Sequence, residues 1–427
     1  MIDIDLIRKR PDWVHEQLRK RADDVEIEPI LDADRRRREL LQQVESARAE
    51  RKQLSKEIGR RRGAGEDTTQ LQEESTKIGD RIDTMSAELS EVEPTLNDLL
   101  LRLPNIADER VPAGDKEGNQ VVRTWGEQPD LGDKPLDHVE LCTRLGLVDY
   151  ERGTKLGGRG FWIYTGFGAM LEWALVDFFA REHLADGYTF VLPPHLLNEE
   201  SGYAAGQFPK FYDDVFHLEP TDRGAAGLFL IPTAETAILN IYRDEILDPA
   251  DMPLKLFAYT PCYRREAGSH RTAERGTIRG HQFNKVEMFQ FCTPEQSDAA
   301  LEELVEKSER LVQKLGLHHR TSLLAARDAS AAMALTYDIE VWIPSIADYK
   351  EVSSASWARD YQARRARIRY RRTGEKGTEY IHTLNASGLA TSRLVPAIVE
   401  QSQQPDGSVV VPEPLRAWLG TDVLRPS

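Results

Sequence analysis

Charged and aromatic side chains alternate in two stretches near the middle of the chain, residues 258–266 and 283–291. Each stretch alternates like a β-strand, and the loop between them is rich in Gly, Arg, Glu and Thr. Because successive side chains of a strand point to opposite sides, Arg264 and Glu266 share one face, as do Phe283, Lys285 and Glu287. Unpaired charge is costly to bury. The pattern therefore indicates the floor of a polar pocket, with a solvent-facing hairpin held by cross-strand ion pairs as the alternative.

Further polar residues fall into three clusters along the chain: Thr233 with Glu235, residues 351–354, and Asn385 and Ser387 with Arg393. Two arginines, an aromatic ring and several carboxylates suit a ligand that combines a polyphosphate, a flat base, a divalent ion and a cationic amino group. The sequence has no G-x-x-x-x-G-K-[ST] loop and no G-x-G-x-x-G after a predicted strand. A nucleotide would have to bind without those loops.

Length and composition limit the classes of protein to consider. A chain of 427 residues predicts two or three domains. The formal net charge of −15 argues against a general nucleic-acid binder, although it leaves room for a local basic patch. Three cysteines without C-x-x-C spacing indicate a reducing compartment, and no apolar run approaches the roughly 20 residues of a membrane helix. We expect a cytoplasmic protein without a membrane segment.

Apolar residues repeat with heptad spacing on both sides of a break at Gly63-Ala64-Gly65. This pattern predicts an antiparallel coiled-coil hairpin over residues 31–103. Its apolar seam is too narrow to pack onto a large core, so the hairpin must project from the rest of the protein. The first helix is rich in Arg and Lys and the second in Asp and Glu. The charges favour two alternatives equally: pairing between the helices, or contact of the basic helix with an RNA backbone.

The rest of the chain predicts an α+β domain. Residues 104–135 are rich in Pro, Gly and Asp and indicate a linker. From 136 to 427, strands arranged as hairpins alternate with long helices, which favours an antiparallel sheet flanked by helices. We expect helices over 137–145, 295–316 and 391–400, and strands over 187–192, 337–343, 349–353, 366–372 and 380–384.

The order of the motifs resembles that of bacterial seryl-tRNA synthetases, a family of class II aminoacyl-tRNA synthetases. The motifs are GYTFVLPP (187–194), GQFPKF (206–211), LIPTAE (230–235), CYRREAGS (262–269), IRGHQFNKVEMF (278–289), DYKEVSS (348–354), DYQARRARIRYR (360–371) and HTLNASGLATSR (382–393). The resemblance implies a tRNA-binding domain with a long arm over 1–103, a linker over 104–135 and a class II catalytic domain over 136–427. It also implies a homodimer joined through residues 187–194.

The resemblance further implies that L-serine reacts with ATP to form seryl-adenylate, and that the seryl group passes to the 3′ end of serine tRNA. The catalytic residues would be Arg264, Glu351 and Arg393. Serine would be bound by Thr233, Glu235, Arg264, Glu287, Asn385 and Ser387. ATP would be bound by Arg264, Arg265, Glu266, Phe283, Glu351, Val352, Ser353, Ser354 and Arg393, and Mg²⁺ by Glu351 and Ser354. No step needs a histidine to carry a proton, so we interpret His281 and His382 as structural.

The sequence departs from the family pattern at several places. These are Arg327-Asp328-Ala329-Ser330, Leu335, the run Ser353-Ser354-Ala355-Ser356-Trp357, Ala386, and the loop over 270–280. We therefore expect an active enzyme with an altered pocket, as in a second copy that serves inhibitor resistance or a biosynthetic pathway. A ligase with a non-tRNA acceptor and a synthetase-like RNA-binding protein are the alternatives. The arginines over 364–372 could form a solvated strand edge or a contact for the end of the tRNA.

Overall fold

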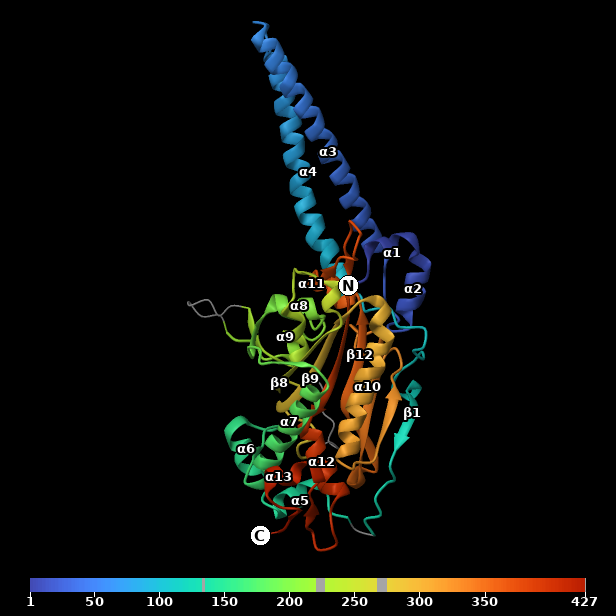
Figure 1. The fold of residues 1–427 in the computed structure, drawn as a ribbon. Coiled ribbons are helices and arrows are strands. Elements are labelled where there is room, and N and C mark those ends of the chain that lie inside the picture. The colour runs from blue at the N-terminus through green and yellow to red at the C-terminus, as the bar shows by residue number, and fades with distance from the viewer. Residues whose placement is uncertain (133–134, 220–226, 267–274, 427) are drawn as a thin grey trace. The chain divides into compact units, whose positions relative to one another are not determined.

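The computed structural model describes residues 1–132, 135–219, 227–266 and 275–426 (Figure 1). The chain forms two compact units, Ile2–Leu103 and Pro104–Ser427, the second together with Met1. Among the described residues, no helix is both long and apolar enough to cross a membrane.

The N-terminal unit consists of helices, as the heptads predict. Pro11 at the first position of α2 has a backbone already set for a helix and lacks only an N–H that would be unpaired there. At 36 residues, α3 is about 54 Å long. The predicted hairpin is confirmed, and its first helix begins three residues earlier, at Glu28. The elements are α1 (Ile4–Lys9), α2 (Pro11–Arg19), α3 (Glu28–Gly63) and α4 (Thr69–Arg102).

The seam between α3 and α4 is narrow. Ala47 packs with Ile78 and Ile82 in a small apolar cluster. Beside it, the guanidinium group of Arg51 lies across Gly79, where a Cβ would come within 3.3 Å of it. A glycine at this position of α4 therefore leaves room for the arginine beside the seam.

An eight-stranded sheet forms the centre of the second unit. Its order is β1-β10-β11-β12-β15-β9-β8-β4, and all neighbours are antiparallel except β4 and β8. The predicted antiparallel sheet is thus confirmed. The strands are β1 (Gln120–Trp125), β4 (Thr189–Val191), β8 (Leu254–Tyr263), β9 (Gln282–Cys292), β10 (His319–Leu323), β11 (Leu335–Ile343), β12 (Asp348–Arg359) and β15 (His382–Ala390).

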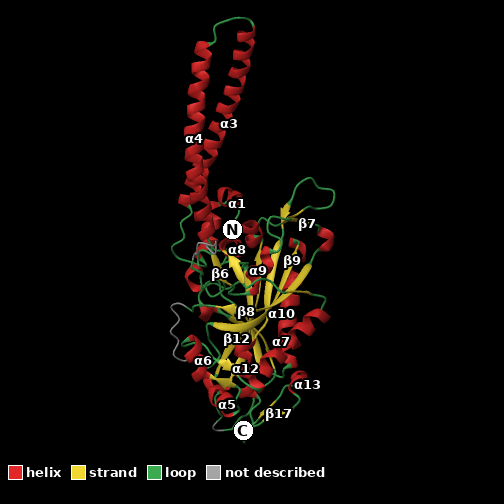
Figure 2. Cartoon of the chain, turned by 90° about the vertical axis from the view of Figure 1, so that its left-hand side faces the viewer, coloured by secondary structure: helices red, strands yellow, loops and turns green. Residues whose placement is uncertain are grey.

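Helices cover both faces of this sheet (Figure 2). On one face, α7 (Phe167–Ala185), α10 (Ser297–Lys314) and α12 (Thr391–Gln401) pack on a large apolar core, and Figure 1 shows α10 and α12 lying across the strands. On the other face, α8 (Glu199–Ala205), α9 (Ala234–Asn240) and α11 (Tyr361–Ala366) share a smaller core with Phe289 and Phe291. The pocket described below lies on this second face.

Short elements complete the unit. The helices are α5 (His138–Arg144), α6 (Tyr150–Gly157) and α13 (Arg416–Leu419). The strands are β2 (Val148–Asp149), β3 (Ile163–Tyr164), β5 (Leu196–Asn198), β6 (Leu228–Leu230), β7 (Ile246–Leu247), β13 (Arg369–Tyr370), β14 (Glu379–Tyr380), β16 (Val409–Val410) and β17 (Val423–Leu424).

The segment 104–135 does more than connect the units. It contributes β1, which pairs with β10 at the edge of the main sheet. Its first residues are also fixed, because the Asn105 side-chain amide donates to the carbonyls of Ala332 and Ala358 at 2.9 and 2.8 Å. Every residue of β1 is exposed, so the strand lacks the apolar alternation that marks a strand in a sequence.

The arginine-rich segment also differs from the prediction. Instead of a strand over 366–372, the chain forms α11, a left-handed residue at Arg367 (φ 55°) and the two-residue strand β13. Arg365 donates to the carbonyls of Tyr203 and Phe208, and Arg372 pairs with Glu379. In the sequence, the many charged residues of this segment obscured the helical spacing of its small residues. Arg365 and Arg372 therefore help to hold the fold together.

Candidate active site

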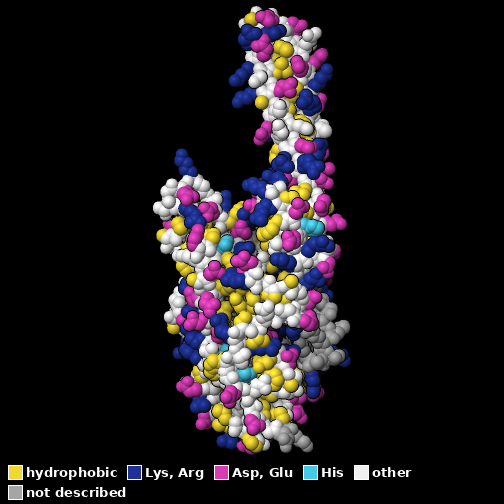
Figure 3. Space-filling view, turned by 90° about the vertical axis from the view of Figure 1, so that its right-hand side faces the viewer, with side chains coloured by type: hydrophobic (Ala, Val, Ile, Leu, Met, Phe, Trp, Pro, Cys, Tyr) yellow, Lys and Arg dark blue, Asp and Glu magenta, His cyan; other side chains and the backbone are white. Residues whose placement is uncertain are grey.

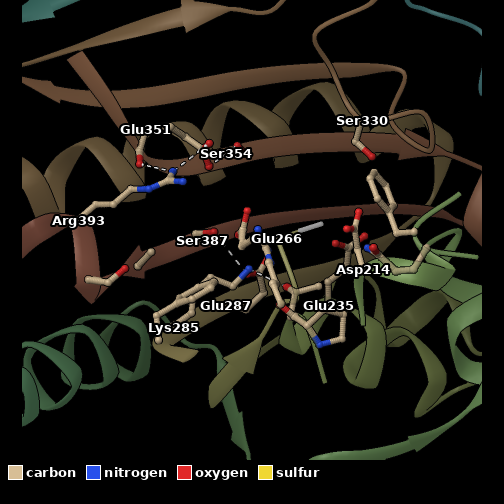
Figure 4. A pocket seen from close by; sticks show the side chains of 18 of the residues that line it. Asp214, Glu235, Glu266, Lys285, Glu287, Ser330, Glu351, Ser354, Ser387 and Arg393 are labelled. Atoms are coloured by element: carbon tan, nitrogen blue, oxygen red, sulfur yellow. Dashed lines mark hydrogen bonds and ion pairs between the residues drawn. The ribbon is translucent and has the colours of Figure 1, made fainter. Parts of the chain in front are cut away.

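A cavity of about 410 Å³ opens beside the ends of β8 and β9 and along β12 and β15 (Figure 4). Its wall includes all but three of the site residues predicted from the sequence. The predicted lining residues are Thr233, Glu235, Arg264, Glu266, Phe283, Glu287, Glu351, Ser354, Asn385, Ser387 and Arg393. In Figure 4, Glu351 and Arg393 lie at one end, Glu235 and Glu287 lie lower in the centre, and Ser330 and Asp214 lie at the opposite end.

The β8–β9 hairpin brings its two polar faces to the same side. Cys262 pairs with Phe283, Thr260 with Lys285, and Ala258 with Glu287, and directly paired residues of antiparallel strands project together. Arg264 and Glu266 follow the end of β8. Glu266 has a φ of 51°, and its carboxylate accepts from Arg279 Nε at 2.7 Å. The interpretation of this hairpin as a pocket floor is therefore correct. Residues 267–274 of the following loop lie outside the described residues.

Two guanidinium groups stand at the end of the pocket where the aromatic ring lies. The Arg264 guanidinium is 5.3 Å from the centre of the Phe283 ring, and its Nε donates to the Pro232 carbonyl at 3.2 Å. Arg393 Nη1 donates to the backbone oxygen of Glu351 at 2.8 Å and to its Oε2 at 3.3 Å. Burial raises the pKa of the Glu351 carboxyl, but the charges of Arg393 and Arg264 outweigh it, so its pKa lies below the ordinary value.

A bulge in β12 brings Glu351 and Ser354 to the same side. Ile339 of β11 pairs with Ser353, whereas the next residue, Glu340, pairs with Glu351, so Val352 is an extra residue in the strand. A bulge of this kind re-aims the side chains around it. Residues three apart in a regular strand would point to opposite faces. Here both Glu351 and Ser354 line the pocket.

Asp338 supports this pair from β11. The Ser354 hydroxyl lies 2.6 Å from Asp338 Oδ1 and 3.1 Å from Glu351 Oε1. Burial, and then the charge of Glu351, raise the pKa of Asp338 well above the ordinary value. The three side chains offer hard oxygen donors, and no group of three His, Cys, Asp or Glu residues able to hold a metal occurs in the described part of the chain. Such a set fits a Mg²⁺ ion that keeps waters and is bound mainly by substrate phosphates.

The centre of the pocket carries a compact network of polar groups. Lys285 forms an ion pair with Glu287 and donates to the Thr233 hydroxyl at 2.6 Å. Asn385 Nδ2 donates to Glu287 Oε1 at 2.9 Å, which leaves the buried Asn385 Oδ1 without a partner among the described residues. An unpaired buried acceptor is costly unless a ligand supplies a donor. This atom therefore points to a ligand with an N–H or O–H group.

Glu235 differs from Glu287 because, among the described residues, no lysine forms an ion pair with it. Burial, followed by the charge of Glu287, raises the pKa of Glu235 to about 7. Its Oε1 accepts from Gln362 Nε2 at 2.6 Å. Glu235 is therefore poised to gain or lose its charge near neutral pH.

Three predicted ATP-binding side chains lie outside the pocket wall. Val352 is buried in the large apolar core, and Ser353 donates from its hydroxyl to the Ser387 carbonyl at 2.5 Å on the side of α10. The bulge turns the Val352 side chain away from the pocket, and strand alternation with Ser354 does the same for Ser353. Arg265 Nη1 donates to the Asp213 carbonyl at 3.2 Å. These three side chains lie outside the pocket wall, and their contact with ATP stays a prediction.

Two of the departures from the family pattern also lie away from the pocket. Trp357 and Ala386 belong to the apolar core on the opposite face of the sheet, because strand alternation separates them from Ser356 and Asn385. The departure at Trp357 therefore does not add bulk to the pocket beside Glu351. By contrast, Ser330 and Met333, from the departing stretch before β11, do line the cavity.

The two histidines have structural contacts. His281 Nδ1 lies 3.0 Å from the Arg264 carbonyl. His382 Nδ1 lies 2.7 Å from the Ser297 hydroxyl, and burial lowers its pKa to about 4, so it is neutral at physiological pH. Neither is in the pocket wall. The geometry agrees with the structural role expected from the sequence.

Several lining residues had no role in the prediction. Lys285 shares the face of Glu287, and Ser356 shares the face of Ser354, so strand parity was the available signal for both. Gln207 and Phe211 lie in a motif that the sequence analysis quoted without a function. Gln362, which lies behind Glu235 in α11, was hidden by its arginine-rich surroundings.

An antiparallel sheet with this pocket defines the catalytic core of a class II aminoacyl-tRNA synthetase. The family model "tRNA synthetase class II core domain (G, H, P, S and T)" matches residues 216–402. The model "Seryl-tRNA synthetase N-terminal domain" matches residues 1–107. The chain belongs to the seryl-tRNA synthetase family.

The similarity to known proteins extends over essentially the whole chain. "Serine--tRNA ligase 2" of Clostridium acetobutylicum is 54% identical over 99% of this chain and 100% of its own length. A serine–tRNA ligase of Desulfitobacterium hafniense is 43% identical, again over 99% of this chain and all of the relative. The crystal structure of the seryl-tRNA synthetase from Pyrococcus horikoshii complexed with ATP has a TM-score of 0.93 and 34% identity, and each chain is covered completely.

Proposed function

We propose that this chain is a serine–tRNA ligase that uses ATP to activate L-serine and then transfers the seryl group to the 3′ end of serine tRNA. The observation that carries this function is the buried group of Glu287, Lys285 and Asn385, with the unpaired Asn385 Oδ1, at the centre of a pocket that presents two guanidinium groups at one end. The full-length similarity to serine–tRNA ligases supports the same substrate.

The nucleotide binds at the end of the pocket that contains Arg264, Phe283, Glu351 and Arg393. The Phe283 ring stacks on the adenine, and Glu266 accepts from its amino group. Arg264 and Arg393 bind the phosphates, because planar guanidinium groups match phosphate oxygens with paired hydrogen bonds. Arg393 then exchanges its contact with Glu351 for one with the nucleotide.

Serine binds between Glu235 and Glu287. Its ammonium group meets Glu235 and Thr233, and its hydroxyl meets Glu287, Asn385 and Ser387. A site that hydrogen-bonds a substrate hydroxyl rejects an analogue without it, because the polar groups of the site then lose their partner. Alanine is excluded for this reason.

The two steps need no covalent protein intermediate. An oxygen of the serine carboxylate attacks the α-phosphorus of ATP, and pyrophosphate leaves with the electron pair of the broken P–O bond. A hydroxyl of the terminal adenosine then attacks the seryl carbonyl, and AMP leaves. Arg264 and Arg393 stabilise the charge that develops on the phosphate, and the pocket holds the reacting atoms together.

Mg²⁺ is part of the proposal. Glu351 and Ser354 would hold it, and Asp338 would orient the Ser354 hydroxyl from behind. Bound there, the ion would neutralise charge on the ATP phosphates.

The α3–α4 hairpin is the proposed contact for serine tRNA. Arg36 pairs with Glu88 at 2.6 Å and Arg37 with Glu93 at 3.0 Å, so these arginines serve the coiled coil. Within the described residues, no ion pair occupies Arg48, Lys52, Lys56 or Arg62, and Figure 3 shows Lys and Arg side chains along the hairpin as far as its end. Free cations on one helix suit the phosphates of a long variable arm.

A homodimer would form through the edge strand β4, in which Phe190 is 39% exposed and after which Leu192 is 73% exposed. Charging of tRNA would take place in the cytoplasm. An altered pocket, as in a second copy that resists inhibitors, is favoured by Ser330 and Met333 in the pocket wall.

Serine-dependent exchange between ATP and labelled pyrophosphate tests the first step. We expect exchange with serine, and exchange with alanine lower by at least about 10³-fold because of the hydroxyl contacts. If the full-length chain catalyses no exchange, the proposal that it is an enzyme is rejected. The synthetase-like RNA-binding protein then remains as the alternative. Equal exchange with alanine would reject the assigned hydroxyl contacts.

A further inference from the structure

A buried glutamine of α11 fixes one of the carboxylates of the pocket from behind. Gln362 is 0% exposed and does not line the cavity. Its Nε2 donates to Glu235 Oε1 at 2.6 Å and to the Ala205 carbonyl at 3.0 Å, and its Oε1 accepts from the Thr383 hydroxyl at 2.6 Å. If the amide were turned over, its oxygen would face two acceptors. The network therefore allows one orientation of this side chain.

The charged groups near Glu235 either bond other partners or repel its carboxylate, so Gln362 is the residue that fixes its position. Lys285 is engaged with Glu287 and Thr233, and the Arg264 Nε bonds the Pro232 carbonyl. Glu287, on β9, repels the negative charge of Glu235. In the described part of the structure, Gln362 is the side chain that donates a hydrogen bond to Glu235. The position of the carboxylate thus depends on a residue that cannot touch the ligand.

We propose that Gln362 is a positioning residue for the amino acid: it keeps the Glu235 carboxylate aimed into the pocket, so that the carboxylate can bind the serine ammonium group. This inference rests on the proposed function and adds a residue of α11 to the recognition of serine. Thr383 of β15 fixes Gln362 in turn, so the carboxylate is connected through α11 to the strand that carries Asn385 and Ser387.

A specific pH dependence follows from this arrangement. A protonated Glu235 cannot form an ion pair with an ammonium group, so kcat/KM for serine falls as the pH drops below the pKa of Glu235, which is about 7. The hydrogen bond from Gln362 favours the ionised form and lowers this pKa. Without it, the pKa rises, and the decline in kcat/KM begins at a higher pH.

The test compares three full-length variants in the pyrophosphate-exchange assay. Gln362→Met removes the amide with little change in volume. Thr383→Val removes the bond that fixes the amide but leaves Gln362 in place. Gln290→Met is the matched control, because Gln290 is also a fully buried glutamine of this unit, and its Nε2 donates to the Tyr188 hydroxyl away from the pocket.

For Gln362→Met we expect KM for serine to rise about tenfold or more, as for the loss of a hydrogen bond to a charged group. KM for ATP stays within about twofold, and the inflection of kcat/KM against pH moves upward by about half a pH unit or more. Thr383→Val changes both quantities in the same direction by less. Gln290→Met moves the melting temperature but leaves the inflection in place.

Two results would overturn the inference. One is an unchanged pH inflection in both Gln362→Met and Thr383→Val. The other is a loss shared equally between serine and ATP, as expected for general damage to the fold. Wild-type chain without serine-dependent exchange would instead count against the proposed function itself, so the two failures are distinguishable. If Gln362→Met does not fold, Thr383→Val carries the same test.

Discussion

Some residues of the pocket contact the ligand, and others hold those contacting residues in place. Arg264 combines a contact with the Phe283 ring, a bond to the Pro232 carbonyl and a place in the cavity wall. A planar fork can make these contacts at the same time, whereas an ammonium group is a point charge on a flexible stem. The residue type is therefore part of the mechanism.

Arg264→Lys should lower kcat/KM for ATP in the exchange reaction by about 100-fold or more, because lysine cannot bind phosphate with two parallel hydrogen bonds. The melting temperature should change little, since Arg264 is only partly buried. Kinetics and a thermal unfolding curve on the same sample check both statements. Retention of near wild-type kcat/KM would remove Arg264 from the catalytic residues.

The departures from the family pattern make a second prediction at this scale. Trp357 is 7% exposed and packs between the guanidinium groups of Arg110 and Arg359, at 5.7 and 5.1 Å. Trp357→Asn should cost about 3 kcal/mol of unfolding free energy. It should not change inhibition by serine-adenylate analogues. Ser330→Gly should shift the inhibition constant by about tenfold, because Ser330 belongs to the pocket wall.

Inhibition constants of serine-adenylate analogues, measured for both variants and the wild type, distinguish a change in the pocket from a change in stability. A large change from Trp357→Asn together with none from Ser330→Gly would contradict the placement of the altered residues. If neither variant nor the wild type differs from an ordinary relative, the altered-pocket idea fails.

Strand parity predicted much of the pocket from the sequence. It placed Phe283 and Glu287 on one face, and their pairing with Cys262 and Ala258 bears this out. It could not reveal the extra residue at Val352, because a bulge depends on the register with β11. Val352 and Ser353 were named as ATP-binding residues on the family resemblance alone, and their side chains lie outside the pocket wall. Gln362 could not be found from a charge pattern, since its role exists only where α11 meets α9.

At the scale of elements, one buried carboxylate joins three segments behind the pocket. Glu172 of α7 accepts from Asn284 of β9 at 2.9 Å and from the hydroxyl of Thr391, the first residue of α12. Two residues later, Arg393 enters the pocket. Burial raises the pKa of Glu172 to about 7, and its Oε2 has no partner among the described residues.

Glu172→Gln should stabilise the protein relative to wild type at pH 8 but not at pH 5. The pKa of Glu172 is higher in the folded chain than in the unfolded chain, so its contribution to stability is present at low pH and is lost as the pH rises toward 7. Glutamine keeps the accepting oxygen without the charge. The difference in unfolding free energy should grow by up to about 3 kcal/mol between the two pH values. Thermal unfolding across this range measures it, and a difference independent of pH would show that Glu172 is not the titrating group.

The elements themselves were predictable to different degrees. Heptad spacing predicted α3 and α4, and helical spacing predicted α10, because both patterns are long and regular. β1 and α11 were missed for opposite reasons. β1 is an exposed edge strand without alternation, whereas α11 buries small residues beneath a charged sequence.

At the scale of the whole molecule, the chain joins a catalytic unit to a helical hairpin on which Arg48, Lys52, Lys56 and Arg62 form no ion pair with any described residue. A ligase that passes the seryl group to a small carrier would have no use for the basic residues of α3. The hairpin therefore favours an RNA acceptor.

Aminoacylation of transcribed serine tRNA by the full-length chain tests the account most directly, with a matched transcript that lacks the long variable arm. We predict that serine is attached to the complete tRNA. We also predict that kcat/KM falls by about 100-fold or more for the shortened one, and that added salt weakens the preference because phosphate contacts are screened. Serine-dependent pyrophosphate exchange without charging of either transcript would contradict the account and indicate a non-tRNA acceptor. Equal charging of both would remove the role assigned to α3 and α4.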